Sequence, residues 1–152
     1  RAEEQAEAIA KQALAWGAQP LLIPTIEIGP PDDWASVDAA LSRLDTYDWL
    51  VFTSVNGVTR FLDRLWSHGG DVRRLGRCRI AAIGPATAAA LEAYHVRCDV
   101  MPTDYSAEGL VAALRPQVTG RRVLWPRANR GREVLIEGLT AAGATVETVI
   151  SY

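Results

Sequence analysis

The sequence predicts an α/β fold in which a parallel sheet carries helices on both faces. Strand-like and helix-like patterns alternate along the chain, as they do when each strand is followed by a helix that crosses back over the sheet. Residues 49–52 are apolar without interruption, which is typical of a strand buried on both faces. The length of 152 residues fits one domain of ordinary size.

The first elements differ from the rest of the chain. Apolar residues recur at helical spacing over residues 2–16, ahead of Gly17, so this segment predicts a helix. Residues 21–28 predict a strand, and Pro24 within it places that strand at an edge or outside the main ladder. The run Gly29-Pro30-Pro31 predicts a boundary, and the body of the domain should begin after it.

The body of the domain repeats a unit of strand, turn and helix. Asp33 and Ser106 are predicted helix caps, and Pro85 suits the first turn of a helix. The predicted strands cover residues 49–52, 80–83, 99–101, 122–125 and 144–150. The predicted helices cover residues 34–43, 55–66, 86–93, 107–114 and 132–142.

The turns that follow the predicted strands are polar and form the candidate functional feature. Because the carboxyl ends of parallel strands meet at one edge of a sheet, these turns should lie together. They supply hydroxyls, amides and the unpaired N–H groups of helix starts, which suit an anionic ligand. The alternative is that each serine or threonine only caps its own helix. The turns lie at residues 53–57, 84–87, 102–107 and 125–129.

The densest positive run surrounds the last of these turns. The net charge of the chain is −2 and aromatic residues are not interleaved with the arginines, so we expect no nucleic-acid surface in this segment. Arg127 and Arg130 lie in the turn itself, where their guanidiniums are well placed to bind a carboxylate. The alternative is that the whole run is solvated. The run consists of Arg121, Arg122, Arg127, Arg130 and Arg132.

Several kinds of site lack their sequence signatures. Residues 84–87 read Gly-Pro-Ala-Thr, which is not the GxGxxG pattern of a dinucleotide site, and no GxxxxGK[ST] pattern is present. His68 and His95 have no partners at catalytic or metal-ligand spacing, so we expect ordinary surface or loop histidines. We therefore expect no nucleotide site, no catalytic triad and no zinc site.

The cysteines and the length of the apolar runs indicate the cellular compartment of the protein. Cys78 and Cys98 form no Cys-x-x-Cys pair, and we expect two buried free thiols in a reducing compartment. No apolar run approaches the ~20 residues of a membrane span, and no signal-peptide pattern opens the chain. We expect a cytoplasmic protein with no membrane contact. Because residue 1 is arginine and a helical pattern is already under way, we also expect a piece of a longer protein.

The order and spacing of several short motifs resemble the uroporphyrinogen-III synthase family. Each motif is weak alone, but together they cover nearly the whole chain. They are Thr53-Ser54-Val55-Asn56-Gly57-Val58, Ala82-Ile83-Gly84-Pro85-Ala86-Thr87-Ala88, Met101-Pro102, Tyr105-Ser106-Ala107-Glu108-Gly109-Leu110, Val123-Leu124-Trp125-Pro126-Arg127-Ala128, Gly143-Ala144-Thr145-Val146 and Val149-Ile150-Ser151-Tyr152.

The resemblance implies a HemD-like fold, in which a Rossmann- or flavodoxin-like three-layer domain is joined to a second domain by two linker strands. The site of the family lies in the cleft between the domains. By this resemblance, residues 1–29 are a helix and linker strand of the first domain, which is mostly absent here. Residues 30–145 are the inserted α/β domain, and residues 146–152 are the return linker strand.

The resemblance also implies an activity. The family is a carbon–oxygen lyase that closes the linear tetrapyrrole hydroxymethylbilane to uroporphyrinogen III, with loss of water and inversion of ring D, in heme, siroheme and cobalamin biosynthesis. It uses no metal or cofactor. Tyr152 and Thr87 are the implied catalytic residues, with Tyr152 assisting loss of the hydroxyl. The implied substrate-binding residues are Thr53, Ser54, Asn56, Gly57, Gly84, Ser106, Ala107, Arg127 and Asn129.

Two alternatives stay open beside the synthase. The chain could be a synthase-like ligand-sensing module of a regulatory protein, as occurs in fusions to DNA-binding domains. It could also be a lobe of a periplasmic-type receptor, against which the lack of a signal peptide counts. For the synthase we expect a monomer, and we expect the isolated segment to be inactive because half of the cleft would be missing.

Overall fold

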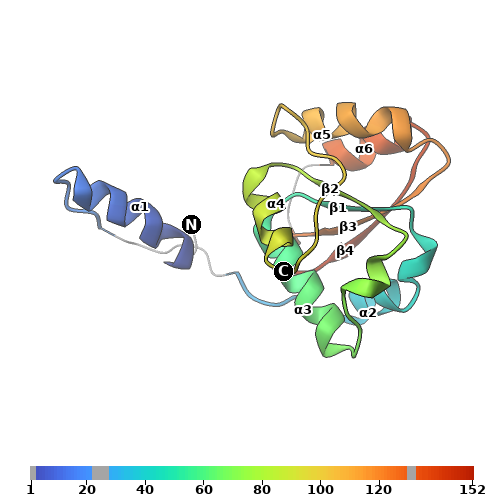
Figure 1. Ribbon diagram of the computed structural model, residues 1–152, viewed down its shortest axis with the longest axis horizontal. Helices are drawn as coiled ribbons and strands as arrows, with labels where there is room; N and C mark the ends of the chain where they lie inside the picture. The colour runs from blue at the N-terminus through green and yellow to red at the C-terminus, as the bar shows by residue number, and fades with distance from the viewer. Residues whose placement is uncertain (1–2, 22–27, 130–132) are drawn as a thin grey trace. The chain divides into compact units, whose positions relative to one another are not determined.

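The computed structural model describes residues 3–21, 28–129 and 133–152, and it divides into two units, Arg1–Pro30 and Pro31–Tyr152. The first unit contains helix α1 (Glu3–Ala15), which confirms the predicted helix (Figure 1). Gly17 follows it with a φ of 78°, and its N–H donates to Leu14. Most of the strand predicted over residues 21–28 lies outside the described residues.

The second unit is built on a sheet that is parallel and four-stranded among the described residues. The strands follow the order β2-β1-β3-β4 (Figure 1). They are β1 (Trp49–Phe52), β2 (Arg79–Ala82), β3 (Arg122–Arg127) and β4 (Thr145–Ile150). The parallel sheet confirms the predicted fold class.

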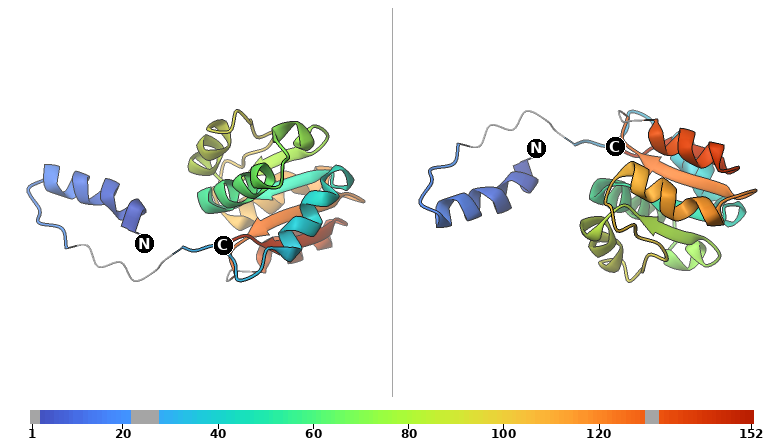
Figure 2. Two further views of the ribbon diagram at one scale, coloured as in Figure 1. Left: turned by 90° about the horizontal axis from the view of Figure 1, so that it is seen from below. Right: turned by 90° about the horizontal axis from the view of Figure 1, so that it is seen from above.

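Helices cover both faces of this sheet, as Figure 2 shows. One buried cluster joins the sheet to α2, α3 and α4, and another joins it to α5 and α6. The α-helices are α2 (Ala35–Ser42), α3 (Val55–Ser67), α4 (Pro85–Glu92), α5 (Ala107–Leu114) and α6 (Val134–Ala141). Short 3₁₀ turns are η1 (Leu44–Thr46), η2 (Val72–Leu75) and η3 (Arg115–Gln117).

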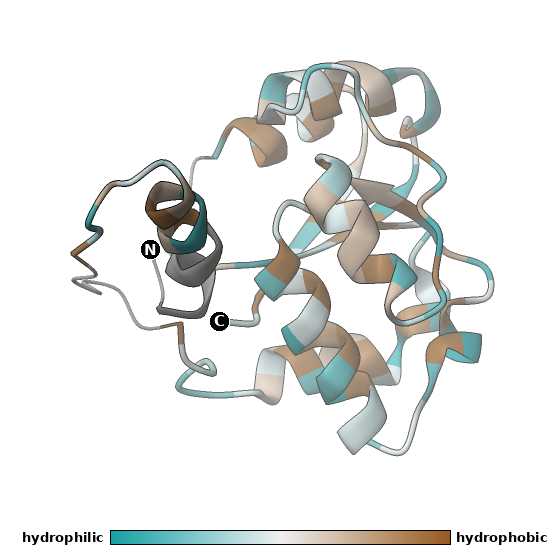
Figure 3. Ribbon diagram, turned by 60° about the vertical axis from the view of Figure 1, so that its left-hand side comes forward, coloured by the Kyte–Doolittle hydropathy of each residue, from teal (hydrophilic) through white to brown (hydrophobic). Residues whose placement is uncertain are grey.

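The side chains of β1 show why both faces are covered. Leu50 and Phe52 point into the α2–α4 cluster, whereas Trp49 and Val51 point into the α5–α6 cluster. Since side chains alternate across a strand, four consecutive apolar residues need an apolar layer on each side. The covering helices have one apolar side, and Figure 3 shows apolar and hydrophilic residues alternating along them.

The strand predicted over residues 99–101 is reduced to one bridge between Val100 and Ala81. Backbone bonds join Asp99 and Val100 to Ile80, and the Asp99 carboxylate accepts the N–H of Ile80 at 2.7 Å. Pro102 follows and has no N–H to continue the ladder. The pairing therefore stops after a single bridge.

Strand β3 runs two residues further than predicted, through Pro126 and Arg127. Along a parallel strand, alternate residues bond to opposite neighbours. The Arg127 carbonyl accepts the N–H of Ser151, on the β4 side, so Pro126 faces β1. Pairing between β1 and β3 ends at Leu124. The N–H that proline lacks is therefore not needed at this position.

The expected return strand at residues 146–152 forms most of β4, an edge strand of the same sheet. It pairs with β3 from Thr145 to Ile150. The compact unit continues to Tyr152.

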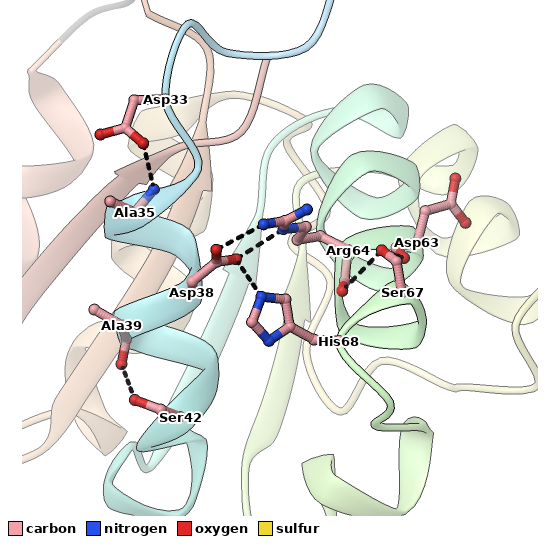
Figure 4. Close-up of polar contacts among 9 residues, drawn as sticks. All are labelled: Asp33, Ala35, Asp38, Ala39, Ser42, Asp63, Arg64, Ser67 and His68. Atoms are coloured by element: carbon pink, nitrogen blue, oxygen red, sulfur yellow. Dashed lines mark hydrogen bonds and ion pairs between the residues drawn. The ribbon is translucent and has the colours of Figure 1, made fainter.

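An ion-pair cluster joins α2 to α3 (Figure 4). Both Asp38 oxygens accept from Arg64, at 2.7 and 2.6 Å, and His68 Nε2 lies 3.1 Å from Asp38 Oδ1. The hydrogen bond from Arg64 is the main cause of the lowered pKa of Asp38. Asp33 accepts the N–H of Ala35 at 2.8 Å, but the N-cap position of α2 is Trp34, one residue after the predicted cap. His68 is exposed, as expected.

Both cysteines are free thiols, but the expectation that they are buried is wrong, because each is partly exposed. Cys78 Sγ donates to the carbonyl of Tyr47 at 3.1 Å. Burial raises the pKa of Cys78 to about 11. In the part of the chain that the structure describes, no helix has the length and apolar character to span a membrane.

Candidate functional site

The strand order creates a switch point between β1 and β3. The chain leaves β1 through α3 toward β2, and it leaves β3 through α6 toward β4 on the opposite face. The turns after these two central strands therefore diverge, and ligands of open α/β folds bind in the crevice that such turns form. The predicted polar turns after β1, β2 and β3 share this carboxyl edge, because their strands are parallel.

A pair of hydroxyls lies at the start of α3. Ser54 Oγ and Tyr152 Oη are 2.6 Å apart, although the residues are 98 positions apart in the chain. Ser54 Oγ also accepts the N–H of Gly57 at 2.9 Å and so caps α3. The phenol therefore lies beside the N-terminus of a helix, where the helix dipole favours negative charge.

Backbone contacts hold Tyr152 in this place. Its carbonyl accepts the N–H of Asn129 at 3.1 Å, and the preceding residue, Ser151, donates to the Arg127 carbonyl at 2.9 Å. A Cβ on Gly57 would lie 3.3 Å from the Pro126 carbonyl and 3.7 Å from a ring carbon of Tyr152. The absence of a side chain at Gly57 thus lets α3 approach both β3 and the tyrosine ring.

A second set of contacts joins the ends of β1 and β3. The indole N–H of Trp125 donates to Thr53 Oγ1 at 3.1 Å. The guanidinium of Arg127 lies 4.8 Å from the centre of the Trp125 ring and 3.2 Å from Glu133 Oε1. Arg127 is only 9% exposed. Its charge is therefore held at the edge by an aromatic face and a carboxylate.

A neighbouring group of residues surrounds the starts of α4 and α5. Ser106 Oγ accepts the N–H of Gly109 at 2.9 Å and donates to Asp104 Oδ2 at 2.7 Å. The ring of Tyr105, which is 58% exposed, lies against buried Gly84, where a Cβ would be 3.3 Å from the ring. The turn at residues 102–107 thus reaches the start of α4.

The structure divides the predicted site residues between these two places. Thr53, Ser54, Gly57, Arg127, Asn129 and Tyr152 lie around the switch point between β1 and β3. Asn56 is in the first turn of α3 and is half-buried. Gly84, Thr87, Ser106 and Ala107 belong to the starts of α4 and α5. Thr87 is only 4% exposed.

Sequence reasoning missed the roles of Trp125 and Glu133. Trp125 lies in a predicted strand and was not a candidate site residue, yet its N–H bonds to Thr53. A tryptophan in a strand that is buried on both faces needs a partner for its N–H, and this was an available signal. Glu133 is the acidic residue beside the arginine run, but the sequence alone does not show that Arg127 is the arginine it contacts. Among the described residues, no group of three or more His, Cys, Asp or Glu side chains could hold a metal ion.

The model of the family described as "Uroporphyrinogen-III synthase HemD" matches residues 7–152. The chain belongs to this family. The uroporphyrinogen-III synthase of Synechococcus elongatus is 37% identical over 159 residues, which cover 100% of this chain and 58% of that protein. A putative uroporphyrinogen-III synthase of Methanothermobacter thermautotrophicus is 34% identical over 137 residues, which cover 90% of this chain and 53% of that protein.

The fold is also that of a solved uroporphyrinogen III synthase structure. The crystal structure of a mutant enzyme from the extremely thermophilic bacterium Thermus thermophilus matches with a TM-score of 0.71 at 20% identity, over 97% of this chain and 58% of that chain. The family match confirms the resemblance seen in the motifs. The chain spans 58% of the length of the Synechococcus and Thermus proteins.

Proposed function

We propose that this chain supplies one side of the active site of a uroporphyrinogen-III synthase. The enzyme would convert hydroxymethylbilane to uroporphyrinogen III by loss of water, cyclisation and inversion of ring D. Membership of the family supports the reaction. The observation that carries the assignment to this edge is the Tyr152 hydroxyl, which lies 2.6 Å from Ser54 Oγ at the start of α3.

The proposed chemistry uses Tyr152 as a general acid. Its proton passes to the hydroxyl of the substrate, the carbon–oxygen bond breaks, and the oxygen leaves as water. Cyclisation with inversion further requires the two ends of the substrate to be held together, so positioning carries much of the catalysis. We propose that Thr87, in the first turn of α4, orients the reacting end.

The carboxylates of the substrate would be held by the polar groups of the carboxyl edge. Helix starts would provide N–H groups at residues 56, 84 and 107, and Thr53 and Asn129 would add side-chain donors. Ser106 would join them by giving up its bond to Asp104. Arg127 adds a positive charge that Glu133 currently neutralises. A substrate carboxylate would therefore share Arg127 with Glu133 or take the place of Glu133.

The remaining features of the enzyme are proposed from its family. Residues 1–29 would belong with a first domain, residues 30–145 would be the inserted domain, and residues 146–152 would lead back to the first domain. The cleft between the domains would complete the site, with no cofactor. We expect a cytoplasmic monomer that binds no nucleic acid through this segment, and light scattering of the full-length protein would test its mass.

The test is to give the full-length protein hydroxymethylbilane and to separate the product isomers. We expect the type III isomer. Formation of the uninverted type I isomer alone would overturn the proposal, and binding without conversion would favour a ligand-sensing module instead.

Within the active enzyme, Tyr152→Phe removes the proton donor and should lower kcat by about a hundredfold, with the fold retained. Tyr94→Phe is the matched control. It removes a phenol that bonds to Asp63 at 2.7 Å, away from the carboxyl edge, and should leave kcat unchanged. Equal kcat values for the two variants would exclude Tyr152 from the chemistry.

A further inference from the structure

The Ser54 hydroxyl caps α3 and also contacts a second hydroxyl, which a helix cap does not need. In the described part of the chain it accepts the N–H of Gly57 and contacts the Tyr152 hydroxyl. Ser106 caps α5 with the same 2.9 Å distance to the N–H of Gly109, but its other described partner is the Asp104 carboxylate. Capping accounts for Ser106, whereas the 2.6 Å contact of Ser54 with a phenol requires a further explanation.

The protons restrict how the two hydroxyls can bond. A serine hydroxyl has one proton to donate and two lone pairs to accept with. The Gly57 N–H already uses one lone pair of Ser54. Two arrangements remain: Tyr152 donates to Ser54, which ties up the phenol proton, or Ser54 donates to Tyr152, which leaves the phenol proton free. Only the second arrangement lets Tyr152 give its proton to a bound substrate.

We propose that Ser54 is a positioning residue for Tyr152, donating its proton to the phenol oxygen and directing the phenol proton toward the substrate. This inference rests on the proposed function, because it concerns the same acid. It differs from the role expected from the sequence, in which Ser54 binds a carboxylate of the substrate. Ser54 acts through Tyr152, and its hydroxyl is occupied by the protein.

The surroundings fix both partners of this bond. The Gly57 N–H holds the Ser54 oxygen at the first turn of α3, so the serine cannot turn away without losing the cap. The N–H of Asn129 donates to the carbonyl of Tyr152. The ring of Tyr152 lies next to Gly57, which has no side chain. Backbone contacts thus hold the Ser54 oxygen and the main chain of Tyr152, and the two hydroxyls lie 2.6 Å apart. A hydroxyl donated to the phenol oxygen also stabilises the negative charge that forms when Tyr152 loses its proton.

The decisive experiment is a double-mutant cycle on kcat in the full-length enzyme, using Ser54→Ala, Tyr152→Phe and the double variant. We expect Ser54→Ala to lower kcat about tenfold, with KM changed by less than about twofold. In the Tyr152→Phe background, Ser54→Ala should lower kcat no further, because the phenol through which it acts is gone. Ser54→Thr keeps the hydroxyl and should restore most of the activity.

Ser106→Ala is the matched control for loss of a cap. It removes an N-cap of the same geometry, so its effect on stability should resemble that of Ser54→Ala. Its effect on kcat/KM should multiply with that of Tyr152→Phe, because Ser106 has no contact with Tyr152 among the described residues. If Ser54→Ala fails to fold, Ser54→Gly replaces it in the cycle, since glycine is nearly as good an N-cap and also lacks the hydroxyl.

Two results would overturn the inference while leaving the proposed function intact. A raised KM with unchanged kcat in Ser54→Ala would assign Ser54 to carboxylate binding. Effects of Ser54→Ala and Tyr152→Phe that multiply would show that the serine does not act through the phenol. Failure of the proposed function is a separate result, because the unmodified protein would then yield no type III isomer.

Discussion

The indole N–H of Trp125 donates to the hydroxyl of Thr53 at 3.1 Å, and this bond ties the end of β3 to the turn that follows β1. The two central strands send their chains to opposite faces, so the turns after them diverge. The bond spans 72 positions of the sequence. It therefore sets the distance between two parts of the site that are remote in the chain.

The Trp125–Thr53 bond should appear as a coupling between two substitutions in the free energy of unfolding. Trp125→Phe removes the N–H donor. Thr53→Val removes the hydroxyl acceptor and nearly keeps the shape of the side chain. In urea unfolding of this chain, the two changes together should cost about 1 kcal/mol less than the sum of the single changes. Additive effects would mean that the bond contributes nothing to the free energy of unfolding.

Gly109 should tolerate no side chain. A Cβ there would lie 2.1 Å from the carbonyl oxygen of Asp104, which is backbone and cannot move aside. We expect Gly109→Ala to lower the free energy of unfolding by about 3 kcal/mol, measured by urea denaturation. Gly29→Ala is the control, because a Cβ at Gly29 meets nothing within 4 Å. Similar stability of the two variants would contradict the close approach at Gly109.

The Asp38–Arg64 pair should make stability depend on pH in acid. The pKa of Asp38 is lowered from 3.8, chiefly by the hydrogen bond from Arg64, so folding favours the ionised carboxylate. The stabilisation is therefore fully present above pH 3.8 and is lost as the pH falls through the lowered pKa. Comparing Asp38→Asn with its parent, both carrying His68→Asn, isolates this pair. Their difference in stability should shrink below pH 3.8, and a constant difference would rule out this linkage.

Cys78 should react slowly with alkylating reagents. Burial raises its pKa from 9.0 to about 11, and the thiolate is the reacting form. A rise of two units lowers the thiolate fraction at pH 8 by about a hundredfold. Iodoacetamide labelling of the Cys98→Ser variant, followed by mass spectrometry, should therefore proceed far more slowly than labelling of a free thiol. Labelling at an ordinary rate would show that Cys78 is not shielded.

The elements of the fold were predictable because their signals are local. Residues 49–52 are apolar throughout, and β1 has the predicted bounds. Ser54 and Ser106 precede helices that begin at the next residue. The errors arose where an element depends on a neighbour. The continuation of β3 through Pro126 depends on which strand each residue faces, and no local pattern reveals this.

The site was predictable in part for the same reason. Parallel strands were enough to place the polar turns at one edge, and Ser54 and Tyr152 were both named as candidates. Their contact was not predictable, since it depends on the strand order and on a backbone bond between Asn129 and Tyr152. The contact between Arg127 and the Trp125 ring was also not predictable. It forms because β3 continues past its predicted end and includes Arg127.

The single bridge beside β2 has a consequence for association between molecules. An open sheet edge offers unpaired N–H and C=O groups to any strand that approaches it. At β2, the Asp99 carboxylate and the Val100 backbone occupy groups of Ile80 and Ala82, and Pro102 follows two residues after Val100. An invading strand finds those groups already taken, so β2 is protected against edge-to-edge aggregation without needing a further full strand.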